Sequence, residues 1–418
     1  MKKILINGFN KLSGSISIKG AKNSVVALIP AAILAQGEVK INNVPKLTDT
    51  ENLRKIIELL GGQIEFNEDS LIVNVNNVKN DIIPEDLSHK LRASYYFMGA
   101  LLARFHHVEM YFPGGCKIGA RPIDYHIDAF EKMGANVIRD EFDKYVIDAP
   151  NLHGAAIDLE FPSVGATVNV MLAASLANGT TIINNAAKEP EIENVQDFIN
   201  RMGGNINGAG TSTIVIEGVK ALHGAEIDVI PDRIAAGTYM MMGAVMGDKF
   251  KVEHINPNHL DSLFKKFDEM NIKYSIDKDS VTLSRSEHIM STDIETLAYP
   301  GFPTDLGQPM AVLLTLANGE CNFTETIYEH RTGHFPELNK MGANIVYEDK
   351  FAKIVGPAKL KGCDVKASDL RAGAALIIAG LVAEGTTKIS NIEHILRGYE
   401  NIVENLMSVG ADIKIIEE

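Results

Sequence analysis

A glycine-rich loop around a cysteine holds the residues with the clearest chemical potential in this 418-residue sequence. Residues 113–122 read PGGCKIGARP, so Cys116 is followed by Lys117 and, further on, by Arg121. Nearby cations favour the thiolate, so we expect Cys116 to have a lowered pKa and to serve as an acid or a nucleophile. The alternative is a structural cysteine, which we instead expect of Cys321 on an apolar element. The sequence has no serine-hydrolase elbow, His-Glu-x-x-His zinc sequence or Walker-type phosphate loop.

Charged and polar residues recur where apolar helices are expected to begin. These starts carry Lys22-Asn23, Arg92, Ser163-Val164-Gly165, Arg233, Asp305 and Arg371. The corners after the following strands carry Asp49, Cys116 with Arg121, Glu189, Glu191, His259, Arg331 and Arg397. A cation at a helix N-terminus is unfavourable unless an anion lies beside it. The whole set predicts helix ends that converge on a multiply anionic ligand. For any single arginine, the alternative is solvated surface charge.

These residues are spaced by an internal repeat. An amphipathic helix that ends in a cap and enters a strand occurs six times, at intervals of 68–73 residues. The six caps begin at Leu60, Met133, Met202, Met270, Met341 and Val409. Each module also has a second helix that is apolar almost all round, as at residues 170–178 and 372–384, which predicts a buried helix. A strand follows it, as at residues 180–184 and 386–390, and a two-stranded hairpin follows each cap.

The two ends of the chain complement each other. The sixth module stops after one strand, and residues 4–7 supply the hairpin strand that it lacks. We therefore expect two three-module domains, one of residues 22–229 that carries the Cys116 loop, and one of residues 1–21 and 230–418. The alternative is a single six-module solenoid, although solenoid repeats are usually shorter.

Composition excludes several classes of protein. The formal charge of −14 argues against general affinity for nucleic acid or an anionic membrane. Three cysteines without a CxxC pair fit a reducing compartment, and the N-terminus lacks the apolar stretch of a signal peptide. The longest apolar run, residues 372–383, is too short to span a bilayer. We expect a soluble, cytoplasmic protein with no membrane or nucleic-acid partner.

Six motifs in order resemble the UDP-N-acetylglucosamine 1-carboxyvinyltransferase family of enolpyruvyl transferases. They lie at residues 17–23 (SIKGAKN), 114–124 (GGCKIGARPID), 163–167 (SVGAT), 302–305 (FPTD), 369–373 (DLRAG) and 397–400 (RGYE). The resemblance covers the whole chain. It implies an α/β fold, the two-domain inverse α/β barrel built from six repeated modules, three per domain, with the active site between the domains. It also implies phosphoenolpyruvate and UDP-N-acetylglucosamine as substrates, addition and then elimination without a metal or cofactor, and fosfomycin as an inhibitor.

The resemblance further implies roles for individual residues. Lys22, Arg121 and Arg397 should bind the phosphate of phosphoenolpyruvate, and Arg331 and Arg371 its carboxylate. Asp305 is the expected base for the sugar 3′-hydroxyl, and Cys116 the group that protonates or captures the enolpyruvyl carbon. The expected sugar-nucleotide contacts are Asn23, Arg92, Arg121, Pro122, Ile123, Asp124, Ser163, Val164, Gly165, Asp305 and Ile327.

The sequence departs from the family pattern at residues 328–335 (YEHRTGHF), at Tyr125 and at Leu396, without loss of a charged group. A rival interpretation is the sister enzyme that acts on shikimate 3-phosphate, which lacks the Gly-Gly-Cys sequence. Two others are a non-catalytic sugar-nucleotide sensor, which would need no base such as Asp305, and a polyanion-binding repeat protein, which fits poorly with a charge of −14.

Overall fold

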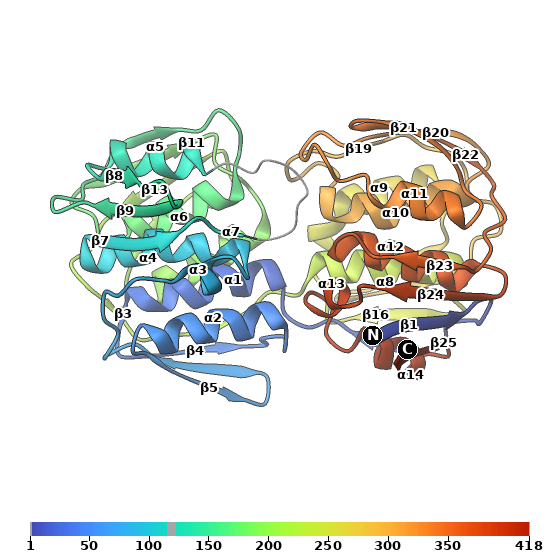
Figure 1. Ribbon diagram of the computed structural model, residues 1–418, viewed down its shortest axis with the longest axis horizontal. Helices are drawn as coiled ribbons and strands as arrows, with labels where there is room; N and C mark the ends of the chain where they lie inside the picture. The colour runs from blue at the N-terminus through green and yellow to red at the C-terminus, as the bar shows by residue number, and fades with distance from the viewer. Residues whose placement is uncertain (1, 115–122, 418) are drawn as a thin grey trace. The chain divides into compact units, whose positions relative to one another are not determined.

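The computed structural model describes residues 2–114 and 123–417, which form two compact domains (Figure 1). The first domain consists of residues 20–114 and 123–230, and the second of residues 2–19 and 231–417. Each has its own hydrophobic core. Within the described ranges, no helix has the length and apolar character needed to cross a membrane.

Sheets of one topology recur in both domains. A short strand pairs in parallel with a central strand, and the hairpin that follows the module's cap adds two antiparallel strands. In the first domain the orders are β15(Glu226–Asp228)-β4(Glu38–Asn42)-β6(Ser70–Asn74)-β5(Gln63–Asn67), β7(His107–Tyr111)-β9(Lys144–Asp148)-β8(Asn136–Arg139) and β10(Ala156–Asp158)-β11(Thr180–Asn184)-β13(Thr213–Glu217)-β12(Asn205–Asn207). A parallel bridge from Ile83 to Met110 takes the place of the short strand beside β7, and β14(Leu222–His223) pairs with β3(Ala35–Gln36).

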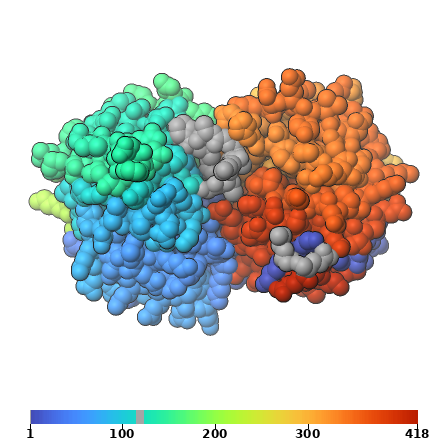
Figure 2. Space-filling model, viewed as in Figure 1, coloured from blue at the N-terminus to red at the C-terminus, as the bar shows by residue number. Residues whose placement is uncertain are grey.

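The second domain repeats this pattern with both ends of the chain. Its orders are β2(Ser15–Ser17)-β16(Phe250–Glu253)-β18(Ser280–Leu283)-β17(Tyr274–Ile276), β19(Ile294–Glu295)-β20(Gly319–Thr324)-β22(Phe351–Gly356)-β21(Asn344–Glu348) and β23(Asp364–Lys366)-β24(Thr386–Ser390)-β1(Lys2–Asn7)-β25(Asp412–Glu417). Ile4 of β1 lies opposite Ile415 of β25 and Ile389 of β24. The N-terminal strand therefore lies among C-terminal elements, which Figure 2 shows as blue atoms within a red and orange surface.

Three almost fully buried helices form the core of each domain, because their sequences are apolar on every face. In the second domain α8(Arg233–Met246), α10(Thr304–Leu316) and α12(Leu370–Val382) pack against one another. In the first domain α4(Tyr96–Phe105) packs against α1(Lys22–Ala31) and α6(Val164–Ala174). The remaining helices are η1(Ala32–Leu34), α2(Thr48–Leu59), α3(Glu85–Ser88), η2(Arg92–Tyr95), α5(Asp124–Lys132), α7(Pro190–Arg201), η3(Pro257–Leu260), α9(Asp261–Glu269), α11(His334–Lys340), α13(Glu393–Leu396) and α14(Ile402–Ser408).

The caps found in the sequence end the amphipathic helices. At each cap the chain turns through a left-handed residue, which is favourable for glycine and tolerated by asparagine. These residues are Gly61 (φ 89°), Gly134 (φ 92°), Gly203 (φ 97°), Asn271 (φ 57°), Gly342 (φ 98°) and Gly410 (φ 101°). The repeat and its caps are thus confirmed.

Two core helices begin where the polar residues predicted, at residues 163–165 and beside Arg371. The helix that contains the apolar stretch from residue 170 begins at Val164, because the Ser163 hydroxyl accepts from the Ala166 amide at 3.3 Å and caps it. It ends at Ala174 and not at residue 178 as expected. The helix that contains the apolar stretch from residue 372 begins at Leu370, because the Asp369 carboxylate caps it by accepting from the Arg371 and Ala372 amides. An apolar run does not reveal such polar caps, which extend a helix beyond the run. Arg92 begins the 3₁₀ turn η2 and not an α-helix.

Candidate active site

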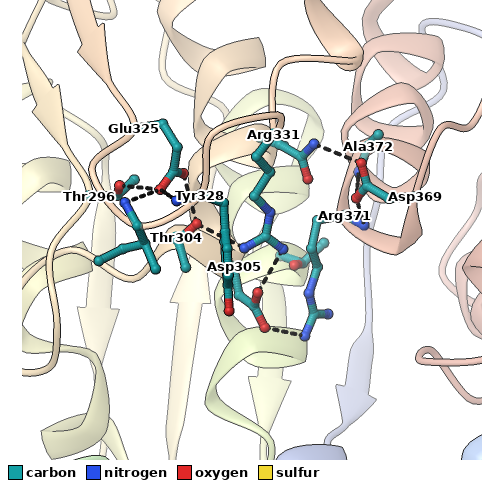
Figure 3. A network of polar contacts seen from close by, with 12 residues as sticks. Thr296, Thr304, Asp305, Glu325, Tyr328, Arg331, Asp369, Arg371 and Ala372 are labelled. Atoms are coloured by element: carbon teal, nitrogen blue, oxygen red, sulfur yellow. Dashed lines mark hydrogen bonds and ion pairs between the residues drawn. The ribbon is translucent and has the colours of Figure 1, made fainter. Parts of the chain in front are cut away.

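A carboxylate held between two arginines lies at the ends of the core helices in the second domain (Figure 3). Asp305 is in the first turn of α10. Its Oδ1 lies 2.7 Å from Nη2 of Arg331, and its Oδ2 lies 2.9 Å from Nη2 of Arg371 in α12. The side chain of Asp305 is 25% exposed, whereas those of Arg331 and Arg371 are 5% and 3% exposed. In this cluster the carboxylate is therefore partly accessible to solvent, whereas the two guanidinium groups are nearly buried.

The two guanidinium groups determine the charge state of Asp305. Burial alone would raise the pKa of Asp305, but the positive charges of Arg371 and Arg331 and their hydrogen bonds lower it well below its usual value. Burial likewise opposes the charge on Arg371, yet Tyr399 and Asp305 raise its pKa. Asp305 is therefore ionised at neutral pH, and both its oxygens accept hydrogen bonds.

Further contacts fix the direction of each guanidinium. Arg371 donates through Nη1 to the Tyr399 hydroxyl at 2.9 Å, and that hydroxyl lies 2.9 Å from the hydroxyl of Thr238. Arg331 donates through Nη1 to the Thr304 hydroxyl at 2.8 Å. In each arginine, one terminal nitrogen thus donates to Asp305 and the other donates to a neutral hydroxyl. Sequence reasoning missed Tyr399, Thr238 and Thr304, because hydroxyl residues are common and their value here depends on three-dimensional proximity.

Two other predicted residues of this domain lie on neighbouring segments. Ile327 is half-buried, in the segment between β20 and Arg331, and its amide donates to the Glu325 carboxylate at 2.8 Å. Arg397 is the C-cap residue directly after α13. The structure thus brings Asp305, Arg331 and Arg371 into direct contact. Ile327 lies four residues before Arg331, and Arg397 lies two residues before Tyr399, which bonds to Arg371.

In the first domain, Lys22 has a carboxylate partner. Lys22 begins α1, and its Nζ lies 3.0 Å from Oδ2 of Asp49 in α2. The side chain of Asp49 is 1% exposed and that of Lys22 is 16% exposed. A cation at a helix N-terminus is thus compensated by an anion, as the dipole argument requires. Asn23, the next residue of α1, is half-buried.

Arg92 is held against the base of the Cys116 loop. Its Nη1 donates to the carbonyl of Pro113 at 3.1 Å. Its guanidinium also lies over the rings of Tyr95 and Phe112, at 5.6 Å and 5.1 Å from their centroids. Arg92 therefore fixes the last described residues before the loop. The predicted residues Cys116, Arg121 and Pro122 lie outside the described residues.

The segment Ser163, Val164 and Gly165 forms the N-terminus of α6. A side chain at Gly165 would collide with Tyr95, because an added Cβ would lie 2.8 Å from the tyrosine hydroxyl oxygen. Tyr95 therefore lies between Arg92 and the Ser163 segment. Asp124 begins α5, where a carboxylate complements the helix dipole, and Ile123 before it is buried.

A buried network behind this segment was not predicted. The side chain of Asn169 accepts from the Gly99 amide at 3.0 Å, donates to the Tyr95 carbonyl at 3.0 Å and lies 2.7 Å from Nδ1 of His126. It joins α4, α5 and α6. Burial lowers the pKa of His126 to about 3, so the ring is neutral. The sequence did contain a signal for this network, because Asn169 is a polar residue in the middle of the apolar run 164–174.

The described parts of the chain contain no group of three or more His, Cys, Asp or Glu side chains arranged to hold a metal ion. The charges that gather at the core-helix ends are instead those of lysine, arginine and aspartate. Such a set suits a ligand that carries phosphate or carboxylate groups, since arginine grips either of them bidentately.

Comparison with known proteins identifies the family. The family model described as EPSP synthase (3-phosphoshikimate 1-carboxyvinyltransferase) matches residues 6–406. UDP-N-acetylglucosamine 1-carboxyvinyltransferase 1 of Streptococcus agalactiae is 49% identical over 421 residues, covering 100% of both chains. The chain belongs to the enolpyruvyl transferase family. UDP-N-acetylglucosamine 1-carboxyvinyltransferase 2 of Listeria monocytogenes is also 49% identical to this enolpyruvyl transferase, over 98% of the present chain and 97% of the relative.

Solved structures confirm the predicted fold class of this enolpyruvyl transferase. The enolpyruvyl transferase NikO of Streptomyces tendae is 26% identical, covers 99% of both chains and superposes with a TM-score of 0.91. EPSP synthase of Acinetobacter baumannii is 17% identical over the full length of both chains, with a TM-score of 0.76, and shares the fold.

Proposed function

We propose that this enolpyruvyl transferase moves the enolpyruvyl group of phosphoenolpyruvate to the 3′-hydroxyl of UDP-N-acetylglucosamine and releases phosphate, a step in peptidoglycan precursor synthesis. The acceptor is inferred from relatives of that name, which are 48–49% identical over nearly the whole chain. The structural observation that carries the proposal is Asp305 held by Arg331 and Arg371. This cluster combines an ionised base, Asp305, with two cations that can bind the anionic donor phosphoenolpyruvate.

In the addition step, Asp305 removes the proton of the sugar 3′-hydroxyl. The hydroxyl oxygen bonds to C2 of phosphoenolpyruvate, and C3 gains a proton. Cys116 is proposed to give that proton or to capture the enolpyruvyl carbon. In the elimination step C3 loses a proton and the phosphate leaves, which restores the double bond. Lys22, Arg121 and Arg397 are proposed to hold the phosphate, and Arg331 and Arg371 the carboxylate.

The remaining proposed contacts are to the sugar nucleotide. They are Asn23, Arg92, Arg121, Pro122, Ile123, Asp124, Ser163, Val164, Gly165, Asp305 and Ile327. Ser163 and Val164 are half-buried at a helix N-terminus, which supports contact with an anionic diphosphate. The position of Arg92 over aromatic rings supports a fixed cation for the same group.

The two arginines also explain how a strongly acidic carboxyl group can act as a base. Asp305 is a weak base because Arg371 and Arg331 hold its pKa well below the usual value. A substrate carboxylate that bonds to the same guanidinium groups offsets their field and competes for their N–H donors. Binding of phosphoenolpyruvate is therefore expected to raise the pKa of Asp305 and make it a better base.

The finer consequences follow from this activity. We propose a cytoplasmic location, in keeping with three cysteines that lack a CxxC pair, and roles in cell-wall formation, cell shape and division. Fosfomycin is proposed to inhibit the enzyme by modifying Cys116.

The test measures phosphate release from phosphoenolpyruvate with either UDP-N-acetylglucosamine or shikimate 3-phosphate as acceptor. We expect release only with the sugar nucleotide, and loss of that release in Cys116→Ala. Release only with shikimate 3-phosphate would assign the sister reaction. No release with either acceptor, from protein shown to be folded, would leave a binding role and refute the proposed transfer.

A further inference from the structure

The corner after the central strand is built differently in the module that carries Asp305. In three other modules an asparagine follows this strand, and its amide donates to a carbonyl at the end of the neighbouring parallel strand. The pairs are Asn43 with Val229 at 3.0 Å, Asn185 with Leu159 at 2.8 Å and Asn391 with Ala367 at 3.3 Å. After β20 the residue is Glu325, and its partner at the end of β19 is Thr296. A residue whose side chain donates is thus replaced by a glutamate whose two side-chain oxygens accept.

Glu325 is 1% exposed and accepts four hydrogen bonds (Figure 3). Its Oε1 accepts from the Thr296 hydroxyl at 2.8 Å and from the amides of Ile327 and Tyr328 at 2.8 Å and 3.2 Å. Its Oε2 accepts from the Thr304 hydroxyl at 2.7 Å. One carboxylate therefore joins the segment that carries Ile327 to the first turn of α10.

The carboxylate also sets the direction of the hydroxyl groups around it. Because the single proton of Thr304 points to Glu325, its oxygen must accept from Nη1 of Arg331, at 2.8 Å. The other terminal nitrogen of Arg331 then meets Asp305 at 2.7 Å. Thr296 behaves in the same way, donating to Glu325 and accepting from the Thr326 amide at 3.0 Å. Both chains of hydrogen bonds end on Glu325.

We infer that Glu325 is a positioning residue for the transfer reaction, which acts through the Thr304 hydroxyl to hold Arg331 on Asp305 and at the same time fixes the Ile327 segment. This inference rests on the proposed function. Glu325 does not touch Asp305, so its effect must pass through Thr304 and Arg331. The link joins a proposed sugar-nucleotide contact to the proposed base.

The substitution Glu325→Gln tests the direction of the bonds with little change in shape. If the amide oxygen keeps the position that faces Thr296 and the two backbone amides, the amide nitrogen faces Thr304. The nitrogen then donates to the Thr304 hydroxyl, whose own proton loses its acceptor. The hydroxyl proton is then free to turn toward Arg331, so the oxygen no longer offers that guanidinium one fixed lone pair. We expect kcat to fall about tenfold, with the KM for UDP-N-acetylglucosamine changed less than about threefold.

The acidic limb of the pH profile of kcat, which reports groups in the complex with substrates, gives a second measurement. A poorly directed Arg331 favours the ionised form of Asp305 less, so in Glu325→Gln this limb should move to higher pH. Thr304→Val should move it in the same direction, and Thr304→Ser, which keeps the hydroxyl, should resemble the wild type. If Glu325 has only a structural role, Glu325→Gln should lower thermal stability without shifting the acidic limb of the pH profile.

A double-mutant cycle tests whether Thr304 transmits the effect. If it does, Glu325→Gln in the Thr304→Val background should lower kcat by less than about twofold further. Additive losses, or an unshifted pH limb in Glu325→Gln, would overturn the inference. As a control, His254→Gly changes the same corner in another module, where His254 has φ 56° and lies 2.8 Å from the Ser17 hydroxyl. That variant should keep the wild-type kcat and pH profile.

A crystal structure of Glu325→Gln separates this inference from the proposed function. The Arg331 guanidinium should no longer bond both Thr304 and Asp305, whichever reaction the wild type performs. An unchanged guanidinium would contradict the positioning role even in an active enzyme. Failure of the wild type to release phosphate with UDP-N-acetylglucosamine would instead contradict the proposed function.

Discussion

Asp305 and Arg371 lie 66 residues apart in the sequence, and their side chains meet at 2.9 Å at the beginnings of two packed core helices. The regular repeat makes this contact possible, because equivalent helices begin at equivalent heights in neighbouring modules. A residue placed at the start of one core helix therefore lies near residues at the start of the next. The repeat thus brings together two residues that belong to separate sequence motifs, Asp305 in residues 302–305 and Arg371 in residues 369–373.

The first prediction concerns Asp305. Asp305→Asn keeps the shape of the side chain but removes both the base and the anion between Arg331 and Arg371. We expect phosphate release to fall by about 10²–10⁴-fold, the usual contribution of a general base. The two nearly buried guanidinium groups also lose their counter-charge, so the free energy of unfolding should fall by about 3 kcal/mol, the low end for a buried pair because Asp305 is partly exposed. Kinetics and thermal unfolding measure these two effects.

An exposed carboxylate provides the control for this prediction. Asp248 forms a 3.5 Å ion pair with Lys11, with a side chain that is 57% exposed. Asp248→Asn should therefore change activity and stability little. Added phosphate or phosphoenolpyruvate should raise the unfolding temperature of Asp305→Asn more than that of the wild type, because an anion can replace the lost charge. Wild-type turnover in Asp305→Asn would exclude this residue as the base.

The fold class could be predicted because each module of the repeat is marked by patterns of residues that are close together in the sequence. The caps at Gly61, Gly134 and Gly342 need left-handed backbone, and such positions can be recognised from glycine in the sequence. Fully apolar helices and alternating strands are equally local signals. Two central strands, Thr180–Asn184 and Thr386–Ser390, were predicted to the residue.

The supporting residues of the site could not be predicted in this way. Glu325 and Thr304 bond to residues as far as 29 and 27 positions away in their own module, and Asn169 bonds to residues of a neighbouring module. Nothing in their local sequence specifies those partners. Arg92 was placed at a helix start by analogy with its counterparts, but the chain forms a 3₁₀ turn there and its guanidinium reaches Pro113. Lys22 was expected beside an anionic ligand, and in the structure its partner is Asp49.

The second prediction concerns thiol reactivity. Cys321 is fully buried in β20, as expected, and burial raises the pKa of its thiol. The pKa of Cys363 is also raised, first by burial and then by the charges of Glu337 and Asp364. Both thiols should react slowly, since the thiolate is the nucleophile. Alkylation by iodoacetamide at pH 7, followed by peptide mass spectrometry, should modify Cys116 first.

Cys116→Ala should abolish the fast phase of this alkylation, and Cys363→Ser should leave it unchanged. Unfolding in denaturant should make Cys321 and Cys363 react at similar rates, which checks that the folded structure protects them. Fast labelling of Cys363 in the folded protein would contradict the prediction.

The third prediction concerns the buried link between α4 and α6. Asn169→Ala would leave the Gly99 amide and the Tyr95 carbonyl without their side-chain partner in the protein interior. Each unsatisfied buried group costs about 1–3 kcal/mol, so we expect a loss of about 2–4 kcal/mol in the free energy of unfolding. Because Tyr95 lies beside Gly165, the KM for UDP-N-acetylglucosamine should rise more than kcat falls. Denaturant titration and steady-state kinetics test the two parts.

An exposed asparagine gives the comparison for this variant. Asn207→Ala removes a side-chain bond on the surface, to Asn205 at 3.1 Å, and should change stability by less than about 0.5 kcal/mol. Equal losses in the two variants would show that burial of the network contributes nothing.

The last prediction concerns His334, which is fully buried at the start of α11 against the ring of Phe335, with centroids 4.0 Å apart. Within the described structure, neither ring nitrogen has a hydrogen-bond partner. Burial lowers the pKa of His334 to about 3, against an attraction from Asp369 and together with repulsion from Arg331. The unfolded chain has an ordinary histidine pKa of about 6.5. The neutral ring is therefore favoured in the folded protein.

The sign of the pH dependence follows from these two values. Between pH 6.5 and 3, His334 is protonated in the unfolded chain and neutral in the folded protein. Its contribution to the free energy of unfolding is therefore fully present above pH 6.5 and is lost as the pH falls. At pH 5 the loss is about 2 kcal/mol. His334→Phe, which keeps an aromatic ring, should lose correspondingly less stability than the wild type between pH 7 and 5, whereas exposed His330→Gln should follow the wild type. Parallel curves for His334→Phe and the wild type would show that this ring is protonated in the folded protein.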